Sequence, residues 1–185
     1  MTKTLWQSSA ISLVTAGAVL CGTTAFAQNK PAKSDPSEQA VLLGQFGDWG
    51  AYTASPGGRK VCFALSKPTS AVTEPAGRKR DASYAFVSTR PAEKVKNEVS
   101  VIVGYPQKAG VDASASLGSA SYVMYTQNDG AWVKNAAEEA QMVEAMRKGS
   151  ELVIKSISTR GTKSVDTYSL KGIGEALDKV AEECK

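Results

Sequence analysis

Short runs of β-type residues recur along the chain, and this recurrence is the strongest constraint on its fold. Nine such runs lie between Val41 and Leu170, and clusters of glycine, proline, asparagine and serine separate them. Glycine and asparagine tolerate the positive φ angles that tight turns require. Many short strands joined by turns are typical of an antiparallel sandwich or barrel, and they argue against a parallel α/β sheet. The sequence therefore predicts a mainly β protein.

Two segments with helical periodicity interrupt this pattern. The segment 135–149 begins at Asn135, which suits the N-cap position, carries Glu138 at the capping-box position and ends at Gly149. Near the C-terminus, residues at spacings of four, three and four lie on one face of a helix. They are Ile173, Leu177, Val180 and Cys184. We predict a short internal helix and a C-terminal helix whose buried face includes the cysteine.

The first 27 residues have the features of a secretory signal peptide. A lysine precedes an apolar run, and an A-x-A cleavage site ends at Ala27. The run is shorter than the roughly 20 apolar residues that a membrane-spanning helix needs, and no later segment is long and apolar enough to span a membrane. We predict a signal peptide over 1–27, a flexible tether over 28–40 that is rich in proline, lysine and serine, and a single domain over 41–185. The mature chain is then expected in the periplasm, or secreted, or at the outer envelope.

The balance of charge argues against nucleic acid as a partner. The chain has 22 basic and 18 acidic residues, which gives a formal net charge of +4. Removal of the signal peptide lowers this to +3, because that segment contains Lys3 and no acidic residue. Domains that bind nucleic acid show a stronger basic excess. We expect a protein or cell-surface partner, no transmembrane segment, and at most a peripheral association with the envelope.

Two cysteines remain after the signal peptide, and we predict that they form a structural disulfide. A single pair in an exported protein is typically bonded, because the compartment is oxidising. The large residues of one run, Val61, Phe63 and Leu65, alternate with the first cysteine and are expected to face the core between two sheets. Cys62 would then lie on the outer face, beneath the C-terminal helix, and bond to Cys184. A redox role is the alternative, but the chain has neither a C-x-x-C motif nor a thiol at a helix start.

The absence of histidine removes several common catalytic and metal-binding sites. Serine and cysteine nucleophiles usually need histidine as a base, and zinc sites commonly use it as a ligand. A carboxylate pair could act without it, and Asp48, Glu98 and Asp166 lie within or beside predicted strands, although solvated turn carboxylates are the simpler interpretation. The turn after Leu170 lacks the third glycine of a dinucleotide-binding motif. We predict no catalytic, cofactor-binding or metal-binding residues, and a protein that is not an enzyme.

Aromatic residues in the predicted strands allow two interpretations. They could stack on a sugar or on the surface of a partner. More often such residues belong to the core or pair across strands, and we favour that interpretation. The residues are Trp49, Tyr52, Tyr122, Tyr125 and Trp132.

A cluster of basic residues lies on the segment 67–82, which shows no periodicity and is predicted to be a long loop. The cluster consists of Arg78, Lys79 and Arg80. Loops at the end of a sandwich often carry binding residues, and the turn from Arg160 to Lys163 is a second candidate. A solvated loop is the simpler interpretation, whereas contact with anionic lipid headgroups or glycans is the functional one.

Five segments occur in order along most of the region after the signal peptide. They are FGDWGAY (46–52), CFALSKP (62–68), STRP (88–91), NEVSVIVGYP (97–106) and STRGTKSVDTYSLKG (158–172), and a terminal helix ending in cysteine follows them. Together they resemble the invasion-associated locus B family of alphaproteobacterial exported proteins. The resemblance implies an immunoglobulin-like antiparallel β-sandwich, a secreted or envelope location, and a link to virulence, since the family is named for the invasion of red blood cells.

These observations favour a non-enzymatic exported protein that acts by contact with a protein or a surface. Three functions remain open at this point. The protein could take part in host-cell interaction or invasion, it could be a periplasmic partner-binding module that maintains the envelope, or, least favoured, it could be a hydrolase that uses carboxylates. The residues predicted to make the contact are Arg78, Lys79, Arg80, Arg160 and Lys163.

Overall fold

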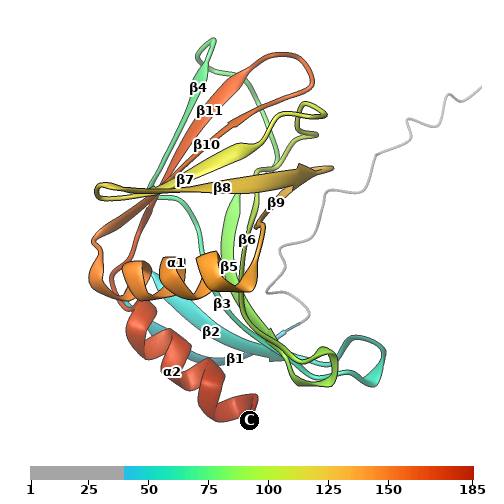
Figure 1. The fold of residues 1–185 in the computed structure, drawn as a ribbon, viewed down its shortest axis with the longest axis vertical. Coiled ribbons are helices and arrows are strands. Elements are labelled where there is room, and N and C mark those ends of the chain that lie inside the picture. Colours follow the sequence, from blue (N-terminus) through green and yellow to red (C-terminus); the bar gives the residue numbers. More distant parts are fainter. Residues whose placement is uncertain (1–39) are drawn as a thin grey trace, which may run out of the picture. The chain divides into compact units, whose positions relative to one another are not determined.

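An antiparallel sheet of eleven strands and two helices make up residues 40–185, the part of the chain that the computed structural model describes (Figure 1). The strands are β1 (Val41–Phe46), β2 (Trp49–Ala54), β3 (Val61–Ser66), β4 (Ser70–Glu74), β5 (Tyr84–Arg90), β6 (Val95–Ile102), β7 (Ala113–Leu117), β8 (Ala120–Gln127), β9 (Gly130–Val133), β10 (Glu151–Ile157) and β11 (Lys163–Ser169). The helices are α1 (Ala136–Lys148) and α2 (Ile173–Glu183), and single 3-10 turns occur at Pro56–Gly58 and Pro91–Glu93. The predicted signal peptide and all but the last residue of the predicted tether lie outside the described residues.

The strands are hydrogen-bonded in the order β1-β2-β3-β5-β6-β9-β8-β7-β10-β11-β4, and every pair is antiparallel. The prediction of a mainly β, antiparallel fold with an internal and a C-terminal helix is confirmed. Hydrogen bonding runs along the whole order, whereas two separate sheets would leave a break. Strand β9 links the two halves of the sheet, which are the strands from β1 to β6 in this order and the strands from β8 to β4. It pairs with β6 on one side and with β8 on the other.

Strand β4 lies far in the sheet from its neighbours in sequence. The chain leaves β3, forms β4 against β11 at the edge of the sheet, and returns to β5 beside β3 (Figure 1). The prediction of a loop throughout 67–82 is therefore wrong for Ser70–Glu74. Its residues are mostly exposed, so they lack the alternation of polar and apolar side chains that marks a half-buried strand. Strand β7 is not among the nine predicted runs either, because it consists of serine, alanine and one leucine.

Helix α1 begins and ends where its sequence predicts. The Asn135 side chain accepts a hydrogen bond from the Glu138 backbone N–H at 2.9 Å, as an N-cap residue does. The helix ends at Gly149, whose N–H donates to the Ala145 carbonyl at 2.8 Å. Its buried residues are Met142, Val143 and Met146, and it contacts β6, β7 and β9. The N-cap and C-cap positions predicted from the sequence, Asn135 and Gly149, are therefore confirmed.

The disulfide between Cys62 and Cys184 is present, and it joins the end of α2 to β3. The helix buries one apolar face, which contacts β1, β2 and β3. At the same end, Lys60 Nζ lies 2.6 Å from Glu183 Oε1. In Figure 1, α2 lies alongside β1 and β2. The predicted pairing of the two cysteines and the predicted buried face of this helix are confirmed.

The face of β3 that carries the main core is opposite to the predicted one. Cys62 and Ala64 are fully buried and belong to the largest core cluster, to which α2 contributes. The alternate residues Phe63 and Leu65 pack with Tyr84 in a smaller cluster on the other face. The prediction that the large side chains face the main core is wrong here. Small side chains beneath the helix allow it to pack closely on the sheet, so residue size alone did not identify the core face.

One large cluster of buried side chains connects both helices to most of the sheet. It includes Trp49 on β2, Met124 on β8, Ile154 on β10 and Leu177 on α2. None of the helices in residues 40–185 is long and apolar enough to cross a membrane. Buried polar side chains on β10 and β11 mark the end of the sheet where the candidate site lies.

Candidate functional site

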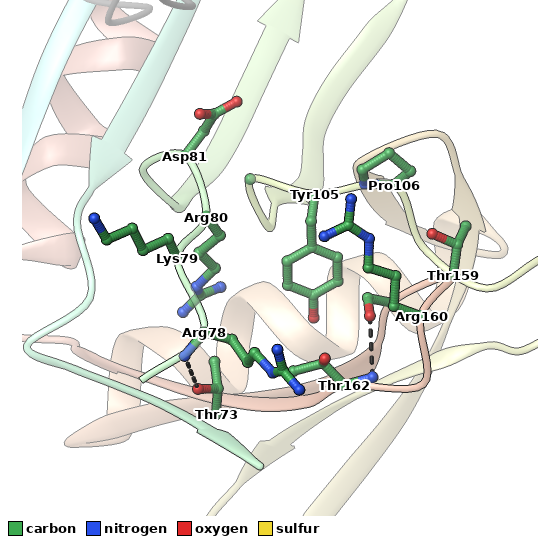
Figure 2. A pocket seen from close by; sticks show the side chains of 12 residues that line it. Thr73, Arg78, Lys79, Arg80, Asp81, Tyr105, Pro106, Thr159, Arg160 and Thr162 are labelled. Atoms are coloured by element: carbon green, nitrogen blue, oxygen red, sulfur yellow. Dashed lines mark hydrogen bonds between the residues drawn. The ribbon is translucent and has the colours of Figure 1, made fainter. Parts of the chain in front are cut away.

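Three connections between strands meet at one end of the sheet and enclose a pocket of about 360 Å³. They are the β4–β5 connection, the start of the β6–β7 connection, and the β10–β11 turn. Figure 2 shows the residues that line it. They are Thr73, Arg78, Lys79, Arg80, Asp81, Gly104, Tyr105, Pro106, Ser158, Thr159, Arg160 and Thr162. Because they come from distant parts of the chain, only the folded sheet creates this pocket.

Backbone hydrogen bonds hold the three connections together. The Asp81 N–H donates to the Gly104 carbonyl, and the Thr159 N–H donates to the Pro106 carbonyl, each at 3.0 Å. Gly104 has a φ of +76°, and a Cβ at this position would lie 2.1 Å from the Asp81 carbonyl oxygen. The close approach of the two connections therefore requires glycine here. As a result, the β4–β5 connection and the β10–β11 turn are fixed to the same short segment.

Tyr105 lies in the middle of the lining residues (Figure 2). Its hydroxyl is 2.6 Å from Ser156 Oγ and 2.5 Å from Ser164 Oγ, which belong to β10 and β11. Both serines are buried, so these hydrogen bonds hold the ring in one orientation. The guanidinium carbon of Arg80 lies 5.8 Å from the centre of the ring, within range of a cation–π contact.

The charge of Arg80 is neutralised inside the protein. Its two terminal nitrogens contact the carboxylate of Asp166, which is fully buried, and one of them also donates to the Val103 carbonyl at 2.9 Å. The Ser83 hydroxyl donates to the same carboxylate at 3.0 Å and lies 2.6 Å from the Tyr168 hydroxyl. Burial lowers the pKa of Arg80, but the hydrogen bond and the charge of Asp166 raise it more, so the net shift is upward. Burial raises the pKa of Tyr168, which therefore keeps its proton.

The residues predicted to make a contact divide into three groups. Arg78, Lys79 and Arg160 are exposed and line the pocket, and none of them has an ion-pair partner within residues 40–185. Arg80 also lines the pocket, but its side chain is only 11% exposed and its charge is matched by a buried carboxylate. Lys163 is not part of the lining and lies 3.4 Å from a glutamate carboxylate on β4.

Two of the three exposed cations face the pocket. Figure 2 shows Arg78 and Arg160 on two sides of Tyr105, whereas Lys79 and Asp81 point away from it. Asp81 is the acidic residue in the lining. The pocket therefore presents two guanidinium groups that no carboxylate in its lining neutralises.

The carboxylates considered as catalytic candidates do not lie together. Asp166 and Glu98 bind different arginines, and Asp48 is exposed in the β1–β2 turn. A second hollow, of about 290 Å³, has Glu74 and Asp112 in its lining, and each of these pairs with a lysine. Within the described part of the chain, no group of three or more acidic, cysteine or histidine residues could hold a metal ion.

The aromatic residues of the strands are engaged with one another or with the core. Trp49 is fully buried. Tyr125 stacks on its cross-strand partner Trp132 with 5.6 Å between ring centres. Tyr52 stacks in the same way on Phe63 at 5.4 Å. Of the five aromatic residues considered in the sequence, four are therefore confirmed as core or cross-strand residues, and the fifth, Tyr122, packs partly buried against the core.

Tyr105 was not predicted from the sequence as a site residue. It follows a predicted strand as an ordinary aromatic residue, and its partners are far away in the sequence. A usable signal lies in β10 and β11, where Ser156, Ser164 and Asp166 occupy positions on the buried face. Polar residues on the core side of two adjacent strands indicate a buried polar network, and such networks are more common near sites than elsewhere.

The fold and the pocket define a small, disulfide-bonded β-sheet protein whose loops form a basic pocket. The model of one family, described as "Invasion associated locus B (IalB) protein", matches residues 49–181, from the start of β2 into α2. The match covers most of the chain, so the protein belongs to the IalB family, as the segments in its sequence predicted. No curated protein and no solved structure gives a significant match.

Proposed function

We propose that this IalB-family protein is exported and acts by contact with a protein or a surface, without catalysing a reaction. The observation that carries the proposal is the convergence of Arg78 and Arg160 on one pocket, with no acidic partner for either within residues 40–185. Uncompensated charge around a hollow is more typical of a surface that attracts a charged partner than of a structural ion pair.

The remaining contact residues differ in their suitability for this role. Lys79 is exposed at the rim and adds to the positive potential. Arg80 is held by Asp166, and Lys163 lies beside Glu74, so both already have acidic partners. We therefore place the contact on Arg78, Lys79 and Arg160. Arg80 has a positioning role beneath them.

Export is supported by the disulfide, because such bonds persist in oxidising compartments. Cleavage of the signal peptide near Ala27 would release the mature chain into the periplasm or beyond it. A role in host-cell interaction or invasion draws support from the family to which the chain belongs. The alternative, a periplasmic module that maintains the envelope, would use the same contact surface on the inner side of that envelope.

Photo-crosslinking in the native bacterium tests the contact surface. A photoreactive residue is placed at Lys79 or Thr159 on the pocket rim, or, as the control, at Gln141, which is exposed on α1. We expect a discrete cross-linked product from the rim positions only, and its loss when Arg78 and Arg160 are changed to glutamate. Equal products from rim and helix, or none from the rim, would refute the proposal. Protease added to intact cells then separates the two roles, since only a product exposed on the cell surface is digested.

A further inference from the structure

We propose that the pocket beside Tyr105 binds a phosphomonoester, with the guanidinium groups of Arg78 and Arg160 on its phosphate. This inference rests on the proposed function, because it names the chemistry that the contact surface recognises. It differs from a general attraction to anionic surfaces, since it assigns one ligand class to one pocket.

The charges in the pocket favour a doubly charged anion. Two guanidinium groups lie on two sides of the space, and the acidic side chain in the lining points away from it (Figure 2). The nearest buried carboxylate, Asp166, is already bound by Arg80 and Ser83, so it does not neutralise the exposed arginines. A guanidinium presents paired N–H donors whose geometry matches two phosphate oxygens. Two such groups match the two charges of a phosphomonoester.

The rest of the lining supplies neutral donors and a flat apolar surface. The hydroxyls of Thr159 and Thr162 make no hydrogen bond with another described residue and could donate to the remaining phosphate oxygens. The Tyr105 ring and Pro106 offer a surface for the carbon skeleton that carries the phosphate. The volume of about 360 Å³ lies within the range of small-molecule sites, about 300–1,000 Å³, and has room for a sugar or glycerol beside the phosphate.

The backbone positions of the two arginines are set before any ligand binds. Arg78 is on the β4–β5 connection, which Arg80 and Asp81 tie to Val103 and Gly104. Arg160 is on the β10–β11 turn, which is tied to Pro106. Pro106 belongs to the β6–β7 connection, the segment that also contains Val103 and Gly104. The backbone positions of both cations are therefore fixed relative to one another, which lowers the entropy that is lost on binding.

Titration of the purified exported protein with methyl phosphate and with methyl sulfate tests the proposal by calorimetry. At neutral pH the phosphate ester carries nearly two charges and the sulfate ester carries one. We expect saturable binding of methyl phosphate at about pH 7.5, with weaker binding at about pH 5, where its second proton returns. The chain has no histidine, whose ordinary pKa lies in this interval. Glu139, whose pKa is raised, is not in the pocket lining and lies between α1 and β6, so the change in affinity reports the ligand. Equal affinity for both esters, or no saturable binding of methyl phosphate, would overturn the proposal.

Matched variants separate the pocket from general electrostatic attraction. The double variant R78Q/R160Q should weaken methyl phosphate binding by about tenfold or more. The control R59Q/K96Q also removes two exposed positive charges, but neither residue lines the pocket, and it should leave the affinity unchanged. The variant R78K/R160K keeps the charges without the paired donors. Its affinity for methyl phosphate should lie between that of R78Q/R160Q and that of the control. Equal weakening by R78Q/R160Q and by the control would also overturn the assignment.

Two further probes identify the source of the phosphate. Glycerol 1-phosphate represents a soluble phosphomonoester, and phosphatidylcholine vesicles with phosphatidic acid represent a lipid headgroup with the same chemistry. Binding to either probe that depends on Arg78 and Arg160 supports the proposal and names the source. If rim positions still cross-link to a partner while no phosphomonoester binds, this inference fails and the proposed function stands.

Discussion

Gly104 joins two of the three connections that form the pocket. Its φ of +76° suits glycine, and an added Cβ would meet the Asp81 carbonyl oxygen at 2.1 Å. Gly110 lies in the same β6–β7 connection with a φ of +72°, but no atom lies within 4 Å of an added Cβ. The two positions thus share the backbone strain of a substitution and differ in the steric clash.

We predict that G104A destabilises the protein more than G110A. The control should cost about 1–2 kcal/mol, the price of a left-handed conformation without glycine. G104A must also push the β4–β5 connection away, so the Asp81 amide should lose its protection from hydrogen exchange. Urea unfolding and hydrogen exchange measure the two effects. Equal stability of the two variants would mean that the connections are not held at Gly104.

Glu139 places a half-buried carboxylate between α1 and β6. Its Oε1 accepts a hydrogen bond from the Val99 backbone N–H at 2.9 Å. Strand β9 pairs with β6 only at residues 100–102, so this carboxylate satisfies a donor next to the end of that pairing. Burial raises the pKa of Glu139, and the hydrogen bond from Val99 only partly opposes this.

The raised pKa predicts how stability depends on pH. The folded protein binds the Glu139 proton more tightly than the unfolded chain, so this group contributes most below the unfolded pKa, and the contribution is lost as pH rises through the folded pKa. E139Q keeps an acceptor for Val99 and carries no charge. Its stability relative to the unchanged protein should therefore rise between about pH 4 and about pH 7 in urea unfolding. E139A should be less stable than E139Q throughout, because it leaves the Val99 N–H without an acceptor. A constant difference between E139Q and the unchanged protein would contradict this.

Helix α2 is held by its apolar face and by the disulfide at its end. The bond joins residues 122 positions apart, so it restricts a long loop in the unfolded chain. We predict that C62A/C184A loses about 4–5 kcal/mol of unfolding free energy in urea. The control is K60A, which removes the exposed ion pair with Glu183 at the same junction and should cost about 1 kcal/mol or less. Similar losses in the two variants would show that the covalent link adds little to the packing of α2.

Local sequence features predict the helices well and the pairing of distant strands poorly. Capping at Asn135 and the apolar spacing in α2 act over a few residues, so the sequence shows them directly. The path of β4 to the far edge of the sheet depends on partners in β11, and no pattern near β4 encodes that pairing. Arg78, Lys79, Arg80 and Arg160 were predicted correctly as members of loops, whereas Lys163 is the first residue of β11. The pocket was not predicted, because Tyr105 joins these residues only after the sheet has formed.

At the scale of the whole molecule, one core cluster links parts of the sheet that lie on both sides of β9. It runs from Trp49 on β2 through Met124 on β8 to Tyr168 on β11, and both helices contribute to it. The indole N–H of Trp49 also donates to the Ser169 carbonyl at 2.9 Å, which connects β2 to β11 directly. We infer that neither half of the sheet can lose its packing without exposing the core of the other.

We therefore predict that residues 41–185 unfold in one cooperative transition. Tryptophan fluorescence, which reports the buried Trp49 and the partly buried Trp132, and circular dichroism of the strands should give the same midpoint in urea. Hydrogen exchange near that midpoint should show the same unfolded fraction in peptides from β2–β3 and from β10–β11. C62A/C184A changes only α2 and β3, yet it should shift both sets of peptides equally, because destabilisation of one cooperative unit is shared by all its parts. If the β10–β11 peptides keep their original midpoint in that variant, the two halves of the sheet are separate folding units.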